Sequence, residues 1–126
     1  MDRKVWKELL MKLYFDYDFK NWNEYINIER RNKFYANKIK QQEKEYIRLM
    51  TIGKKYNGNY PVEIIVKPHF KDHRQDLDNV RIKGLLDGLV SSGTIKNDNL
   101  NCIQKIAYIP IFDSKKGIEI EIKEAI

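Results

Sequence analysis

The sequence has few cysteines and no long apolar run, and each shortage excludes a class of protein. Its single cysteine, Cys102, cannot form an intrachain disulfide, so we expect a protein of a reducing compartment, most simply the cytoplasm. The longest apolar run, Ile106 to Phe112, is far shorter than the ~18–20 residues that span a bilayer. The charged start, MDRKVWKELLMKLYF, is unlike a secretory signal peptide. We therefore expect neither secretion nor a membrane partner.

The length and charge of the chain favour one globular domain with an anionic partner. A chain of 126 residues suits a single domain, and we expect one over residues 1–126. Lys and Arg number 24 against 18 Asp and Glu, which gives a net charge of +6. Nucleic acid is the commonest anionic partner of a basic protein, although many proteins of this charge bind none.

Hydrophobic periodicity predicts an α+β fold, a small mixed sheet with a long helix and a second helix packed on it, in the order (α)βαβαββ. The first helix, within residues 1–12, is an optional extra element. The other predicted elements are a strand over 13–19, a helix over 21–50, a strand over 60–67, a helix over 79–91, and strands over 103–112 and 118–122. We expect Pro68 to end the second strand, Gly93 to stop the second helix, and residues 113–117 to form a hairpin between the last two strands.

The long helix has two stripes at helical spacing. Asn21 followed by Glu24 predicts a capping box at its start. The apolar stripe, which should pack on the sheet, consists of Ile28, Tyr35, Ile39, Tyr46 and Met50. The basic stripe consists of Arg30, Lys33, Lys40, Lys44 and Arg48. This second stripe is either a solvated face or a track for DNA phosphates.

The densest chemistry lies in residues 69–99. Asp76 and Asp78 flank one apolar residue, so in extended backbone their carboxylates point to the same side. Asp98 lies in a turn after the second helix, which can return beside the first pair, and Lys83 lies on that helix. Carboxylate oxygens suit Mg²⁺, or Mn²⁺ as an alternative, and a lysine can stabilise developing negative charge.

Other interpretations of these residues are weaker. Asp76 or Asp78 could simply cap the following helix. An EF-hand is excluded because Arg81 stands where its loop needs glycine. Zinc is disfavoured because His69 and His73 have only the distant Cys102 to join them. We expect His73 and Arg74 to lie instead in a loop near phosphate.

The motifs of this segment resemble those of the RusA-type Holliday-junction resolvases. The matching residues are DLDN at 76–79, Lys83 followed by LLDGL at 85–89, and Gly93 followed by NDN at 97–99. The resemblance covers residues 60–122, and NWNEYINIERRNKFYANKIK is similar to the front helix of a phage- and Gram-positive-associated branch. Three residues separate Asn79 from Lys83, where the better-known pattern has two. We place the extra residue at the helix entry, between Asn79 and Ile82, with Arg81 as the competing cation.

The resemblance implies a Mg²⁺-dependent homodimeric endonuclease that cuts four-way DNA junctions symmetrically during recombination and repair. It implies that Asp76, Asp78 and Asp98 bind the metal, that Lys83 is catalytic, and that Asn79 lies beside the site. Two other functions remain open from the residues alone. One is a non-catalytic DNA-binding or architectural protein that uses the basic stripe, and the other is a nuclease for other branched DNA.

Overall fold

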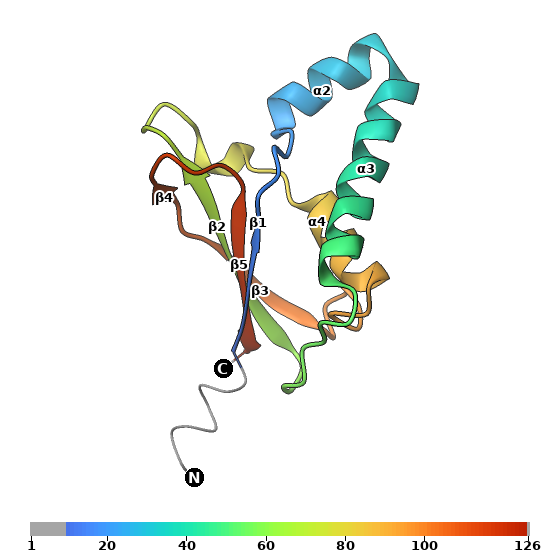
Figure 1. The fold of residues 1–126 in the computed structure, drawn as a ribbon, viewed down its shortest axis with the longest axis vertical. Helices are drawn as coiled ribbons and strands as arrows, with labels where there is room; N and C mark the ends of the chain where they lie inside the picture. Colours follow the sequence, from blue (N-terminus) through green and yellow to red (C-terminus); the bar gives the residue numbers. More distant parts are fainter. Residues whose placement is uncertain (1–9, 126) are drawn as a thin grey trace.

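The computed structural model describes residues 10–125 and confirms the α+β class (Figure 1). Its strands are β1 (Met11–Phe15), β2 (Val62–Phe70), β3 (Ile103–Tyr108), β4 (Ile111–Phe112) and β5 (Ile118–Glu124). Its helices are α2 (Trp22–Arg31), α3 (Lys33–Thr51) and α4 (Lys83–Ser91), with a short 3₁₀ turn, η1 (Leu77–Asn79), before α4. Within residues 10–125, no helix is both long enough and apolar enough to cross a membrane.

The sheet is mixed and has the strand order β1-β5-β2-β3, with β4 pairing with the end of β2. β5 is antiparallel to both β1 and β2, whereas β3 runs parallel to β2. Figure 1 shows the helices on one side of this sheet. Because successive side chains of a strand face opposite sides, the odd-numbered β1 positions and the even-numbered β5 positions supply the buried face.

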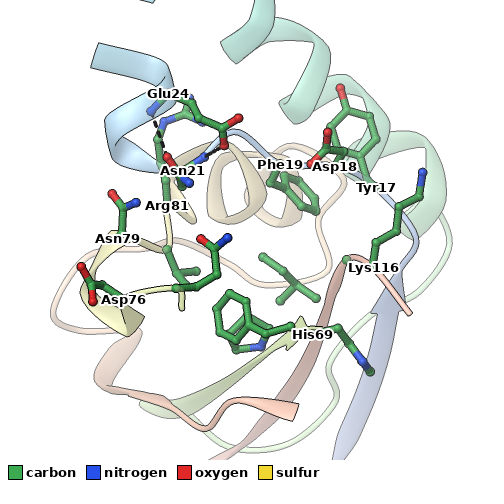
Figure 2. A pocket seen from close by; sticks show the side chains of 16 residues that line it. Tyr17, Asp18, Phe19, Asn21, Glu24, His69, Asp76, Asn79, Arg81 and Lys116 are labelled. Atoms are coloured by element: carbon green, nitrogen blue, oxygen red, sulfur yellow. Dashed lines mark hydrogen bonds between the residues drawn. The ribbon is translucent and has the colours of Figure 1, made fainter. Parts of the chain in front are cut away.

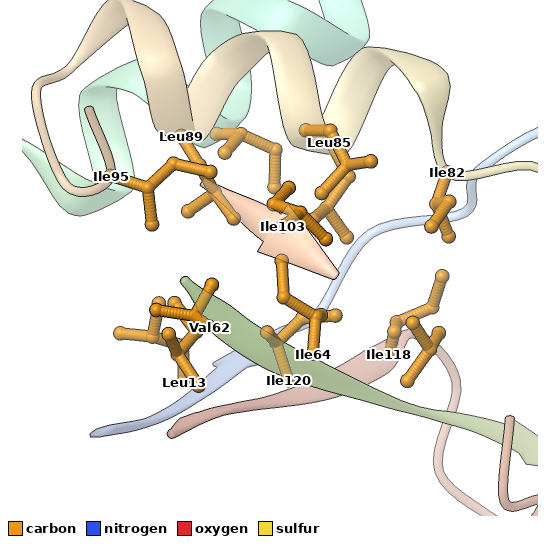
Figure 3. Packing of buried hydrophobic residues seen from close by; sticks show 14 of the residues in the cluster. Leu13, Val62, Ile64, Ile82, Leu85, Leu89, Ile95, Ile103, Ile118 and Ile120 are labelled. Carbon is orange, nitrogen blue, oxygen red and sulfur yellow. The ribbon is translucent and has the colours of Figure 1, made fainter. Parts of the chain in front are cut away.

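The core lies between α4 and the sheet (Figure 3). Leu85 and Leu89 of α4 are fully buried against the strands, where Ile64 and Ile120 are also fully buried. On its other side α4 meets α3 through two glycines. A Cβ at Gly84 would lie 3.0 Å from the Glu43 Cβ, and one at Gly88 would lie 2.5 Å from the Ile47 Cβ. The missing side chains therefore allow the two helices to approach closely, and this holds the first turn of α4 against the middle of α3.

The predicted long helix is in fact two helices that meet at Asn32. The capping box of Asn21 and Glu24 at the start of α2 is confirmed. Asn32 then leaves the helical conformation, and its side chain accepts a hydrogen bond from the Tyr35 amide to begin α3. The predicted apolar stripe is correct at Ile39, which is buried, and at Tyr46, which packs against the core, but wrong at Tyr35 and Met50, which are exposed. The buried positions of α3 are Ala36, Ile39, Glu43, Ile47 and Thr51.

Several strand predictions also need correction. The first strand ends at Phe15 rather than at residue 19, and Pro68 lies inside β2, which continues to Phe70. The pairing of β2 with β5 reaches Pro68, so the sheet carries the chain past the proline. The predicted strand over 103–112 is divided into β3 and β4. Residues 113–117 do not form a hairpin between neighbours, because β5 lies on the opposite side of β2 from β3 and β4.

The remaining differences concern helix ends. The predicted helix over 79–91 begins only at Lys83, although it ends as expected, and Gly93 has the positive φ of +79° that a helix stop requires. Of the optional first helix over 1–12, residues 1–9 lie outside the described residues. Met11 and Lys12 belong to β1.

Candidate active site

The best-defined part of the candidate site is the ammonium group of Lys83, at the start of α4. Its Nζ lies 3.2 Å from the Asp87 carboxylate, one helical turn further along, and 3.7 Å from that of Asp98. Asp98 belongs to the turn that follows α4, and its amide N–H donates to the Asn97 side chain at 2.7 Å. The chain after α4 thus returns beside the first turn of the helix and brings Asp98 to Lys83, whereas the sequence analysis expects it beside Asp76 and Asp78.

The surroundings of Lys83 keep its side chain charged. The hydrogen bond to Asp87, and to a smaller degree the charge of Asp98, raises the pKa of Lys83 above its ordinary value. The side chain is about half exposed, at 55%. Lys83 is therefore an accessible cation, which can stabilise negative charge on a phosphate.

Asp76 and Asp78 lie in the turn before α4, and both are exposed. Asp76 immediately precedes η1, but its carboxylate makes no capping hydrogen bond there. α4 begins without a side-chain cap, because Ile82 occupies the N-cap position. Neither Asp caps α4, and Asp76 does not cap η1. Residues 80 and 81, where we place the extra residue of the motif, lie between η1 and α4 and outside both.

A pocket of about 210 Å³ opens beside Asp76 (Figure 2). Asp76 and Asn79 line one side of it, and the segment with Tyr17 and Asp18 lines another. Lys116 adds a cation at the rim. The pocket therefore combines aromatic, acidic, amide and basic groups next to a predicted catalytic residue.

Asn79, which is predicted to lie beside the site, also makes a hydrogen bond to the first turn of α2. Its side-chain oxygen accepts a hydrogen bond from the Asn23 amide at 3.1 Å, in the first turn of α2. The Asn21 side chain accepts from the Glu24 amide in the same turn at 2.9 Å. Two free N–H groups at the start of α2 are thus satisfied, one of them by the turn that carries Asp78. Asn79 fixes α2 to the candidate site.

Arg81 cannot serve as the competing surface cation, because it is buried. Its Nη1 donates to both carboxylate oxygens of Glu43, at 2.7 and 3.0 Å, and to the Lys20 carbonyl at 3.2 Å. The guanidinium also lies over the rings of Tyr25 and Trp22 of α2. Burial raises the pKa of the Glu43 carboxyl, and the charge of Arg81 opposes that effect. The sequence analysis missed this pair, although Arg81 lies between Asp78 and Lys83.

The predicted loop residues His73 and Arg74 are exposed, as is the ion pair that Arg74 forms. His73 stacks on the Phe112 ring, with 3.9 Å between the ring centroids. Arg74 donates to Asp72 at 2.7 and 3.0 Å, and this contact lowers the pKa of Asp72 to about 2. His69 is not part of this surface. Its side chain is buried, and Nδ1 is 2.9 Å from the Asp113 carboxylate.

The basic stripe is divided between two helices. Arg30 lies near the end of α2, whereas Lys33, Lys40, Lys44 and Arg48 lie on α3. Lys40, Lys44 and Arg48 are partly buried, and Arg48 is held by Glu45 at 2.5 and 2.9 Å. The carbonyls of Lys40 and Lys44 face Gly84 and Gly88, so this part of the stripe borders α4. The basic stripe of α3 therefore runs alongside the helix that carries Lys83.

The donor chemistry of the site fits a hard divalent cation. Asp76, Asp78 and Asp98 offer only carboxylate oxygens, which Mg²⁺ and Mn²⁺ prefer. Asp98 already contacts the ammonium of Lys83, so this carboxylate is accessible to a positive charge. Within residues 10–125, no three His, Cys, Asp or Glu side chains are gathered around one point as metal ligands would be. The residues match the ion in chemistry, but the structure does not assemble them around it.

Comparison with family models gives the class of the protein. The model of endodeoxyribonuclease RusA matches residues 2–123, nearly the whole chain, so the protein is a nuclease that cuts within DNA. The chain belongs to the RusA family. Comparison with curated proteins gives no match.

Proposed function

We propose that the protein is a Mg²⁺-dependent endonuclease that resolves four-way DNA junctions in recombination and repair, with Mn²⁺ as an alternative ion. Asp76, Asp78 and Asp98 would hold the metal. The observation that carries the proposal is the position of Lys83, a charged and accessible group 3.7 Å from Asp98 and five residues beyond Asp78. Membership of the RusA family supports the same reaction class.

The side chains around the site have separable roles in phosphodiester hydrolysis. The reaction needs an activated water and stabilisation of negative charge on phosphate, and a bound divalent cation supplies both. Lys83 stabilises the charge that develops on the phosphate oxygens, because its raised pKa keeps it protonated. The Asp87 carboxylate lies 3.2 Å from the ammonium of Lys83. This contact would keep Lys83 oriented if the Asp98 carboxylate bound the metal ion instead of Lys83.

A purely DNA-binding role explains these residues less well. Exposed aspartates would repel the phosphates that the basic stripe attracts, unless a cation lies between them. Cutting a junction symmetrically requires two active centres, and Asp76, Asp78 and Asp98 supply one set of proposed metal ligands per chain. We therefore propose that two copies of the chain act as a homodimer with twofold symmetry on branched DNA.

The test is a gel assay of strand cutting on a synthetic four-way junction, with and without Mg²⁺. The proposal predicts paired nicks at opposite positions only when Mg²⁺ is present, and little cutting of linear duplex. Equal or faster cutting of flaps or forks would instead identify a nuclease for other branched DNA. Binding without cutting under all conditions would favour an architectural protein.

Light scattering and a cruciform plasmid test the dimer. We expect a dimer in solution, and linear plasmid as the first product because both strands are cut within one encounter. A stable monomer that still makes paired nicks would contradict the dimer.

A further inference from the structure

The corner between α2 and α3 exposes an aromatic side chain that is not packed in the core. Asn32 is the single residue between the two helices. Its amide donates a hydrogen bond to the Ile28 carbonyl at the end of α2, and its side chain caps the start of α3. Figure 1 shows the corner at the top of the molecule, beyond the end of the sheet. Phe34, in the first turn of α3, is 91% exposed there, and the neighbouring Tyr35 is 53% exposed. Burying Phe34 would be favourable, and together with Tyr35 it forms an exposed aromatic pair at the corner.

The same corner is strongly basic. Residues 30–42 contain five cations and no carboxylate, namely Arg30, Arg31, Lys33, Lys38 and Lys40. Exposed Glu29 directly precedes Arg30 and offsets one of these charges, whereas the nearest acid that follows, Glu43, is buried against Arg81 and offsets none at the surface. An exposed aromatic surrounded by cations is the combination that binds single-stranded nucleic acid, in which bases stack on the ring and phosphates contact the cations. A hydrophobic protein partner would not require the cations.

The corner lies at a useful distance from Lys83. Gly84, the next residue of α4, packs beside the Lys40 carbonyl of α3. Phe34 lies six residues before Lys40 on the same helix, which corresponds to about 9 Å at ~1.5 Å per residue. That length equals roughly three nucleotide steps of a DNA strand. The corner and the start of α4 therefore lie along the same stretch of α3, and a strand that follows α3 away from the candidate site runs towards the corner.

We propose that Phe34, together with Tyr35, stacks on base faces that are left unstacked at the centre of branched DNA, while the cations of the corner contact the phosphates beside them. The inference rests on the proposed function and adds a reason why a branched substrate is preferred. In a continuous duplex each base pair is covered by its stacked neighbours and offers no free base face, so the corner discriminates branch points from linear DNA. Phe34 is thus a specificity residue, separate from the acids and from Lys83.

The test compares the affinities of three variants for a four-way junction and for linear duplex of equal length, in EDTA so that neither DNA is cut. Phe34→Ala should weaken junction binding about tenfold or more and leave duplex binding unchanged. Phe34→Trp should keep the preference, and its added fluorescence should be quenched by the junction but not by the duplex. The control is Ile52→Ala, an exposed apolar residue at the opposite end of α3, which should match the wild type.

Three results would overturn the inference. The first is an unchanged junction-to-duplex ratio in Phe34→Ala, and the second is an equal loss on both DNAs. The third is a change of oligomeric state by light scattering, which would make Phe34 a contact between copies of the chain. Failure of the proposed function is seen separately: a wild-type protein that never cuts junctions refutes the function, while the binding ratio still decides the role of Phe34.

Discussion

Arg81 and Glu43 form a buried ion pair that connects the candidate site to α3. Their side chains are 2% and 1% exposed, and Nη1 of Arg81 donates to both carboxylate oxygens. Arg81 stands between Asp78 and Lys83, so the pair fixes the segment that carries both predicted catalytic groups. Its role is to position that segment, because the guanidinium is not accessible to a phosphate.

Arg81→Ala should therefore destabilise the fold rather than weaken DNA binding directly. Removing one partner leaves a buried, uncompensated carboxylate, which costs about 3–5 kcal/mol. Urea denaturation measures this loss. Arg74→Ala is the matched control, since it removes an arginine whose ion pair with Asp72 is exposed, and its free energy of unfolding should stay near the wild-type value. Equal stability of the two variants would contradict the structural role of Arg81.

Local signals in the sequence predicted a large part of this architecture. Asn21 and Glu24 predict the start of α2, and Gly93 predicts the end of α4, because capping and positive φ depend on neighbouring residues alone. The return of the chain after α4 also follows from a helix and its loop, although the contact that Asp98 makes is with Lys83 rather than the predicted approach to Asp76 and Asp78. These features are local, so one sequence is enough to indicate them.

The features that were missed depend on contacts between distant segments. Alternating side chains at 118–122 predict a strand but not its place between β1 and β2, which joins residues far apart in the chain. Asn32 interrupts helical spacing that otherwise continues on both sides, so the pattern alone predicts one helix. Glu43 and Arg81 look like surface residues until the fold brings them together across 38 positions.

Lys83→Ala should lower the cleavage rate by orders of magnitude at saturating Mg²⁺, with little change in junction affinity. The reason is that its ammonium acts on charge that develops during the reaction. Single-turnover cleavage and a binding titration separate the two effects. Lys105→Ala, which removes a lysine paired with Glu63 on the sheet, is the control and should cut normally. A lower junction affinity with an unchanged cleavage rate would mean that Lys83 binds DNA and has no catalytic role.

The pH dependence of cleavage gives a second check on Lys83. Because Asp87 raises the pKa of Lys83, the ammonium stays charged throughout the neutral and mildly alkaline range. From about pH 7 to pH 9 the cleavage rate of the wild type should therefore not fall through loss of the Lys83 proton. The pH profile of Lys83→Arg should have the same shape over this range. A decline that disappears in Lys83→Arg would mean that Lys83 loses its proton in this range.

Neutralising Lys33, Lys40 and Lys44 tests whether the basic stripe contacts phosphates. Each lost phosphate contact should reduce the slope of log K against log salt concentration by up to ~0.9. Junction binding measured across a salt series gives the slope. Arg48→Gln should change it less, since Glu45 already pairs with that arginine. An unchanged slope in the triple variant would make the stripe a solvated face.

The central claim is that Asp76, Asp78 and Asp98 form the metal-dependent centre of a junction-cutting nuclease. Its most direct test is the single-turnover rate of junction cleavage in Mg²⁺ by Asp76→Asn, Asp78→Asn and Asp98→Asn, with junction affinity measured in parallel. We predict that each variant loses cleavage while it binds the junction as tightly as the wild type or more tightly, because each change removes a negative charge that faces phosphate. Near-normal Mg²⁺-dependent cutting by all three variants would contradict the assignment.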